Sequence, residues 1–109
     1  MANTYKVLGQ SNPSATTATT LYTCGSASGA VVSTISICNQ AASAGTFRIA
    51  VRPAGATLAA QHYIAYDTAI TANNSTMLTL GVTLANTDVI TVYASSATMS
   101  FAAFGSELS

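Results

Sequence analysis

The chain has 109 residues and a formal net charge of zero. Its only charged residues are Lys6, Arg48, Arg52, Asp67, Asp88 and Glu107. An average soluble domain has about 25% charged residues, so charge contributes little to the solubility of this chain or to ligand capture. Three cations are too few to hold nucleic acid by its phosphates, and no apolar run approaches the roughly 20 residues of a membrane span. We therefore expect neither nucleic acid nor membrane as a partner.

Alternation of apolar and polar residues predicts short strands along the whole chain. The first strand begins at Tyr5 and Val7, and the others cover 19–24, 31–38, 46–53, 62–68, 76–82, 88–95 and 98–105. Turn residues separate them, as in Asn73-Asn74 and Pro53-Ala-Gly55. The pattern predicts an all-β, single-domain antiparallel β-sandwich of about eight strands spanning 1–109, with Ig-like and jelly-roll connectivity both open.

The segment 9–20 is small, polar and low in complexity. It suits a surface loop, or a joint that lets the N-terminal strand leave the body and pair with a neighbour, so 1–20 is a possible strand or arm with a flexible loop. The N-terminus has neither a basic cap with an apolar run nor a small-residue cleavage site, and we expect no signal peptide.

Cys24 and Cys38 flank a predicted turn at 24–29. If the strands on either side form a hairpin, the two residues lie more than about 20 Å apart. A disulfide needs Cα atoms within about 7 Å. We therefore expect two free thiols in a reducing compartment.

The sequence contains no recognisable catalytic or metal-binding constellation. The chain has one histidine and three acids, and no motif places them near each other, whereas acid–base catalysis needs paired titratable groups. His62 is expected in a strand, with Ile64 and Tyr66 on its side. We expect no enzyme activity, no metal and no cofactor.

Arg48 and Arg52 are four residues apart on a predicted strand, so both should project from the same outer face, separated by the small Ala50. Such a face suits a protein interface, where arginine is enriched. It suits better a solvated strand face, or a local ion pair with Asp67 on a neighbouring strand. Tyr63 shares the parity of Asp67, opposite Ile64 and Tyr66, and could be an exposed aromatic residue.

The chain as a whole resembles small virion proteins of tailed phages, many from cyanophages and environmental phages. The resemblance covers MANTYKVLGQ at 1–10, LYT at 21–23, FRIAVRPAG at 47–55, HYIAYD at 62–67, LTLG at 78–81, DVITVYA at 88–94 and FAAFGSE at 101–107. This chain departs from the pattern at Cys24-Gly25, where similar chains read Val-Pro.

The resemblance implies a non-enzymatic structural role in the virion, after synthesis in the host cytoplasm. The first hypothesis is a capsid decoration (cement) protein, a homo-oligomer that contacts the major capsid protein through its N-terminal segment, including Tyr5 and Lys6, and through the Arg48/Arg52 face. The second is a tail, baseplate or fibre component, or a glycan-binding adhesin module that uses Tyr63 and the Asn73-Asn74 loop. A cellular carbohydrate-binding or adhesion module is a third.

Overall fold

Every predicted strand is present in the computed structural model, which describes residues 3–108. Residues 1, 2 and 109, which the predicted domain includes, lie outside the described residues. The strands are β1 (Thr4–Ser11), β2 (Thr19–Thr23), β3 (Ala30–Asn39), β4 (Gly45–Arg52), β5 (Tyr63–Ile70), β6 (Ser75–Leu84), β7 (Val89–Ala94) and β8 (Met99–Glu107). Two short 3-10 turns, η1 (Pro53–Gly55) and η2 (Ala60–His62), lie between β4 and β5. The all-β prediction is confirmed.

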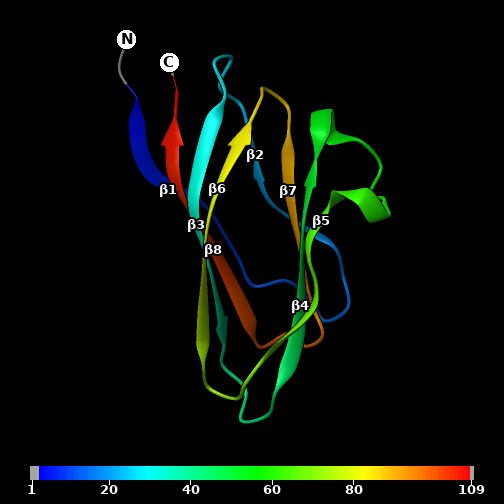
Figure 1. Cartoon of the computed structure of the whole chain (residues 1–109). Coiled ribbons are helices and arrows are strands. Elements are labelled where there is room, and N and C mark those ends of the chain that lie inside the picture. The colour runs from blue at the N-terminus through cyan, green and yellow to red at the C-terminus, as the bar shows by residue number, and fades with distance from the viewer. Residues whose placement is uncertain (1–2, 109) are drawn as a thin grey trace.

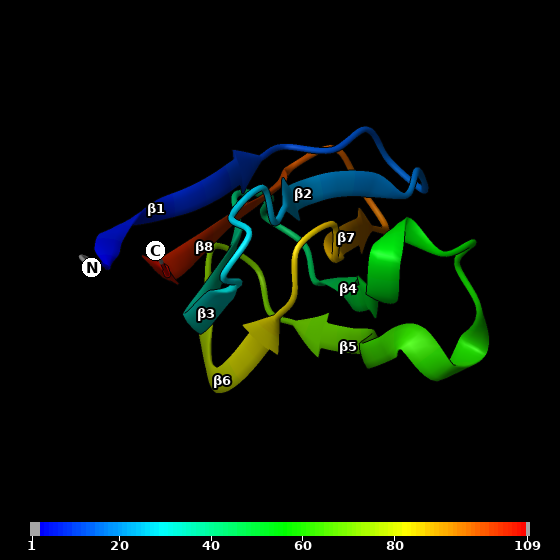
Figure 2. The ribbon, with the colours of Figure 1, turned by 90° about the horizontal axis from the view of Figure 1, so that it is seen from above.

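The eight strands form two four-stranded antiparallel sheets that face each other (Figures 1 and 2). One has the order β1-β8-β3-β6 and is called the β1 sheet; the other has the order β2-β7-β4-β5 and is called the β2 sheet. Consecutive strands often lie in different sheets, so the chain crosses repeatedly from one layer to the other. This order is that of a jelly roll, and it decides the connectivity that the sequence left open.

The core fills the space between the two sheets. Phe47 on β4 and Phe101 on β8 meet there edge to face, with ring centroids 6.3 Å apart. Ile35, Ile49 and Ile90 surround them and are fully buried. Because strand residues alternate between faces, the regular parts of the strands contribute every second side chain to this core and the others to an outer surface. The sandwich therefore has two outer faces, one on each sheet, and both are available for contacts.

The strands on either side of the Cys24 turn do not form a hairpin. The segment after Cys24 links β2 to β3, which lie in different sheets and do not pair. The backbone N–H of Cys24 instead donates to the carbonyl of Asp88, and its carbonyl accepts from Thr87. Both cysteines are free thiols; Cys24 is buried, and Cys38 is half-buried.

The predicted position of His62 in a strand is also wrong. His62 ends the turn η2, is buried, and its Nδ1 accepts a hydrogen bond from the N–H of Ala59 at 3.1 Å. Strand β5 then begins at Tyr63, and its pairing with β4 shifts twice, around Ile64 and around Asp67, which has a left-handed φ of 47°. Each shift changes the side to which the following residues point. Tyr63 and Tyr66 consequently contact each other, although the parity of a regular strand separates them.

The N-terminal strand belongs to the β1 sheet of its own chain. β1 pairs with β8 from Thr4 to Ser11. In the following loop, Nδ2 of Asn12 donates to the carbonyl oxygens of Ala97 and Met99, and the N–H of Thr16 donates to Ala94. The segment 9–20 is thus partly strand and partly a loop that is fastened to the body.

The carboxylate of Glu107 connects the N-terminal strand β1 with a strand of the opposite sheet. Glu107 on β8 lies 2.7 Å from the Lys6 ammonium, and it accepts a 2.6 Å hydrogen bond from the Tyr22 hydroxyl on β2. The hydrogen bond from Lys6 and, after it, the one from Tyr22 lower the pKa of Glu107 below its ordinary value of 4.5. Burial and the bond to Glu107 raise the pKa of Tyr22, so the phenol stays a donor.

This arrangement predicts acid sensitivity. Because the pKa of Glu107 is lower in the folded chain, its ionised form contributes stability above pH 4.5, and that contribution is lost as the pH falls through the folded-state pKa. We expect the unfolding temperature of the wild-type protein to fall more steeply on acidification than that of a Glu107→Gln variant. Thermal unfolding of both proteins from neutral pH downward measures this difference, and parallel curves would contradict the prediction.

Candidate interaction surface

All six charged side chains are satisfied within the chain. Lys6 pairs with Glu107, and Arg48 pairs with Asp67. The carboxylate of Asp88 accepts the N–H groups of Ala54 and Ala85, each at 2.8 Å, and Arg52 bonds within its own sheet and the turn that follows it. The rest of the surface is mostly hydroxyl and apolar. Four of the six charges neutralise each other in the two ion pairs, and the charges of Arg52 and Asp88 bond only to neutral groups. With so little charge, contacts must rely mainly on shape, apolar area and neutral hydrogen bonds.

Arg48 is the centre of a cluster on the outer face of the β2 sheet. Its guanidinium carbon lies 4.2 Å from the ring centroid of Tyr66 and 4.3 Å from that of Tyr93. Its Nε donates to Oδ1 of Asp67 at 2.6 Å, and Nη2 donates to Oδ2 at 3.3 Å. Tyr63 packs edge to face on Tyr66, with ring centroids 4.9 Å apart. We call these five residues the Arg48 cluster.

The ion pair fixes the charge state of the Arg48 cluster. The hydrogen bond from Arg48 lowers the pKa of Asp67, and the same bond raises the pKa of Arg48. Two aromatic faces and a carboxylate together restrict the rotamers of a side chain that is otherwise flexible. Arginine and tyrosine are the residue types that anchor protein interfaces, and a group that is ordered before binding loses less entropy on association.

Arg52 has a different structural role from Arg48, because it bonds to the turn that follows β4. It projects from the same face of β4, as predicted, and its Nε donates to Oγ1 of Thr91 at 3.0 Å. Its Nη1 donates to the carbonyl oxygens of Gly55 and Ala56. Ala54, in that turn, has a left-handed φ of 54°. Arg52 therefore holds the turn η1 against the sheet.

A shallow cleft of about 640 Å³ lies beside the Arg48 cluster. Its lining residues are Leu58, Ala59, Ala60, Tyr63 and Tyr66. The loop between η1 and η2 extends outward from this sheet, as Figure 2 shows, and forms one side of the cleft. The lining is apolar apart from the two phenols, and so it suits a neutral ligand or an apolar side chain of a partner.

Four of the six residues predicted as contacts come together here. Arg48, Arg52, Tyr63 and Asp67 share the outer face of the β2 sheet, where Arg48 and Asp67 form the local pair that the sequence offered as one alternative. The other two, Tyr5 and Lys6, lie on β1 in the opposite sheet.

Sequence reasoning missed Tyr66 and Tyr93. Alternation places Tyr66 on the opposite face from Tyr63, because a register shift such as those in β5 leaves no mark in the pattern. Tyr93 is opposite Arg48 only through the pairing of β4 with β7. The one signal in the sequence for Tyr93 is that it is an aromatic residue at an outward position of the β7 segment.

Within residues 3–108, no three His, Cys, Asp or Glu side chains gather as a metal ion requires. The same residues include no helix that is long and apolar enough to cross a membrane. Comparison of the chain with protein-family models, with curated proteins and with solved structures finds no match.

Proposed function

We propose that this chain is a non-enzymatic structural protein of a tailed-phage virion, and specifically a capsid decoration protein that braces neighbouring capsomers. The observation that carries the proposal is that all six charged side chains bond within the chain, four in two ion pairs and Arg52 and Asp88 to neutral groups, which leaves a surface with little charge to attract a partner. Such a surface suits a protein that is held between neighbours. Repetition on a symmetric shell turns modest contacts into stable attachment.

The Arg48 cluster is the proposed contact with the shell. Tyr66 is 57% exposed and Arg48 presents an ordered guanidinium edge, so a partner can cover both without rearranging them. The adjacent cleft would take an apolar side chain from the shell protein. The jelly-roll fold occurs in viral capsid proteins and in lectins alike, and it therefore does not choose between candidate functions by itself.

The first experiment is immunogold labelling of intact virions with an antibody to this protein. Label over the heads is expected for a decoration protein. Label confined to tails would contradict it and favour the second candidate, a tail or fibre module that binds glycans. The tyrosine-lined cleft supports that candidate, because aromatic rings can stack on sugar rings.

A reconstitution experiment tests the contact surface. Particles depleted of the protein are mixed with purified variants, and the bound copies are counted by quantitative gel electrophoresis. We expect Tyr66→Ala to weaken binding at least tenfold, a typical hot-spot effect, without loss of folding. Arg48→Ala combined with Asp67→Asn removes the ion pair as a unit, while Asn tolerates the left-handed backbone at position 67; we expect the same weakening.

Asn86→Ala, in the exposed β6–β7 turn, is the matched control and should bind like the wild type. Full occupancy by the Tyr66 and Arg48 variants would show that the Arg48 cluster is not the contact. Arg52 is left unchanged in this series because its loss would loosen the turn η1.

A further inference from the structure

The outer face of the β1 sheet is a second, different surface. None of the outward-pointing residues in its four paired strands is charged. Lys6 and Glu107 pair with each other on the other side of the sheet, where Glu107 also accepts the hydrogen bond from Tyr22 of the β2 sheet. Four large apolar side chains project from it: Tyr5 is 81% exposed, Met77 68%, Val7 49% and Phe104 37%. They make up most of the exposed large hydrophobic residues in the described part of the chain.

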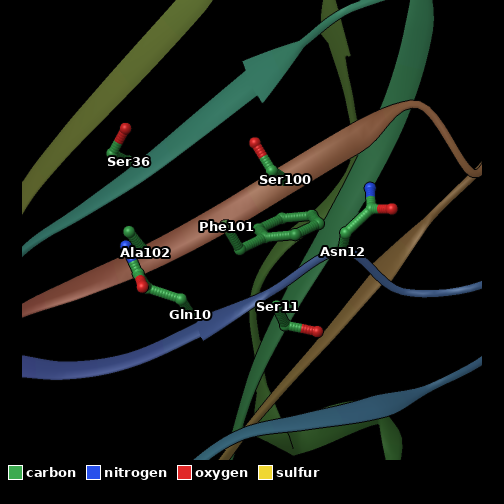
Figure 3. Close-up of a pocket in the computed structure, with 7 residues that line it drawn as sticks. All are labelled: Gln10, Ser11, Asn12, Ser36, Ser100, Phe101 and Ala102. Carbon is green, nitrogen blue, oxygen red and sulfur yellow. The ribbon is translucent and has the colours of Figure 1, made fainter.

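This face has a ridge and a hollow. Tyr5 and Val7 project from the first half of β1, and Val7 pairs in register with Phe104 on β8. The second half of β1 borders a hollow of about 340 Å³. Figure 3 shows its lining, in which Gln10, Ser36, Ser100 and Ala102 come from the neighbouring strands β1, β3 and β8. Tyr5 and the hollow thus lie at opposite ends of the same edge strand.

Because this face has no charge, it favours a partner whose contact surface is also uncharged. The surface of an average protein, about 25% charged, would have to bury some of its charges here without a counter-charge, which is costly. A second copy of the same face brings no charge. The shapes of the two copies also match. A two-fold axis that lies in the plane of the contact and crosses the middle of β1 places the ridge of each copy over the hollow of the other.

We propose that the outer face of the β1 sheet binds a second copy of this chain in a two-fold dimer, with Tyr5 of each copy seated in the hollow of the other. Val7 and Phe104 then lie near the axis and pack on their counterparts. The contact is isologous, so every interaction occurs twice. The proposal concerns a surface other than the Arg48 cluster and does not rest on a role in the virion.

A buried hydroxyl agrees with this arrangement. Ser106 is opposite Tyr5 in register, and its Oγ has no hydrogen-bond partner among the residues that the structure describes. A buried polar group without a partner is uncommon in native proteins. In the dimer, the amide of Gln10 from the second copy lies over this end of the sheet and can supply the missing partner.

The size of the face is sufficient for a specific but weak dimer. Four strands about 4.8 Å apart, each with about eight residues at about 3.3 Å, cover roughly 500 Å². Two copies together bury about 1,000 Å² or slightly more, at the lower limit for a specific interface. We therefore expect dissociation in the micromolar range and little dependence on salt, because no ion pair crosses the interface.

Sedimentation velocity of the purified full chain over a range of concentrations tests the proposal. The wild type should pass reversibly from monomer to dimer. Tyr5→Asp and Ser100→Arg, which place opposite charges on the ridge and in the hollow, should each weaken the dimer at least tenfold. Mixed in equal amounts, the two variants should associate again, because one contact gains an ion pair and the other keeps its native residues.

Val7→Asp and Ile64→Asp are a matched pair, since these apolar residues are 49% and 47% exposed on different sheets. Val7→Asp should abolish dimerisation and Ile64→Asp should leave it unchanged. Circular dichroism and thermal unfolding check that every variant is folded. Any one of four results would overturn the proposal. The first is a wild type that stays monomeric or forms trimers, and the second is a Tyr5→Asp dimer as stable as that of the wild type. The third is a loss of dimer from Ile64→Asp equal to that from Val7→Asp, and the fourth is a failure of the mixed variants to associate.

Discussion

Replacing Phe101 with alanine is expected to lower the free energy of unfolding by about 3–5 kcal/mol. Phe101 is 2% exposed and packs edge to face on Phe47, which is fully buried, so the substitution opens a cavity where the two sheets meet. A loss of this size is a large share of the roughly 5–15 kcal/mol that stabilises an average domain. Urea unfolding followed by circular dichroism measures it.

Phe104 provides the matched control for this experiment. It lies three residues further along the same strand but on the outer face, where it is 37% exposed. Phe104→Ala should cost less, about 1–2 kcal/mol in the monomer, since the side chain is only partly buried and its loss opens no cavity between the sheets. Similar losses for the two variants would mean that the core does not lie between the sheets as described.

The second large effect is expected at Asn39. Its side chain is 1% exposed, and its Nδ2 donates to the carbonyl oxygens of Ser43 and Thr71 at 3.0 and 3.2 Å. Its Oδ1 accepts the N–H of Ala41 at 3.1 Å. Asn39→Ala removes the buried partner of three partly buried backbone groups at once, and we expect a loss of about 3 kcal/mol.

Asn74 serves as the comparison for Asn39. It lies in the adjacent β5–β6 turn, is exposed, and bonds locally to Thr71 and Ser75. Asn74→Ala should change the free energy of unfolding by about 0.5 kcal/mol. Urea unfolding of both variants gives the comparison. Equal and small effects would show that water replaces the Asn39 side chain without penalty.

The two outer faces give the sandwich two separable contacts. The Arg48 cluster on the β2 sheet is the proposed contact with a different protein, while the β1 sheet is the proposed contact with a second copy. They lie on opposite sides of the core, so a dimer would keep two Arg48 clusters free. Variants that remove only one contact should therefore separate assembly of the dimer from attachment to a particle.

The candidate surface was only partly predictable from the sequence. The spacing of Arg48 and Arg52 was enough to place both on one outer face, because alternation holds along the regular strand β4. It failed on β5, where Asp67 adopts a left-handed conformation and Ile64 is an extra residue in the pairing. These irregularities bring Tyr63 and Tyr66 together, and no local pattern signals them.

The sequence by itself determined the class of fold and the position of the strands, because period-two alternation and turn residues are local properties of the chain. It also determined the neutral surface, since six charges that cancel are visible in the composition. Only the tertiary structure decided that the connectivity is a jelly roll, that β2 and β3 lie in different sheets, and that Tyr93 and Tyr66 enclose Arg48. Those features depend on which strands pair and in which register, and pairing is fixed by packing between residues far apart in the chain.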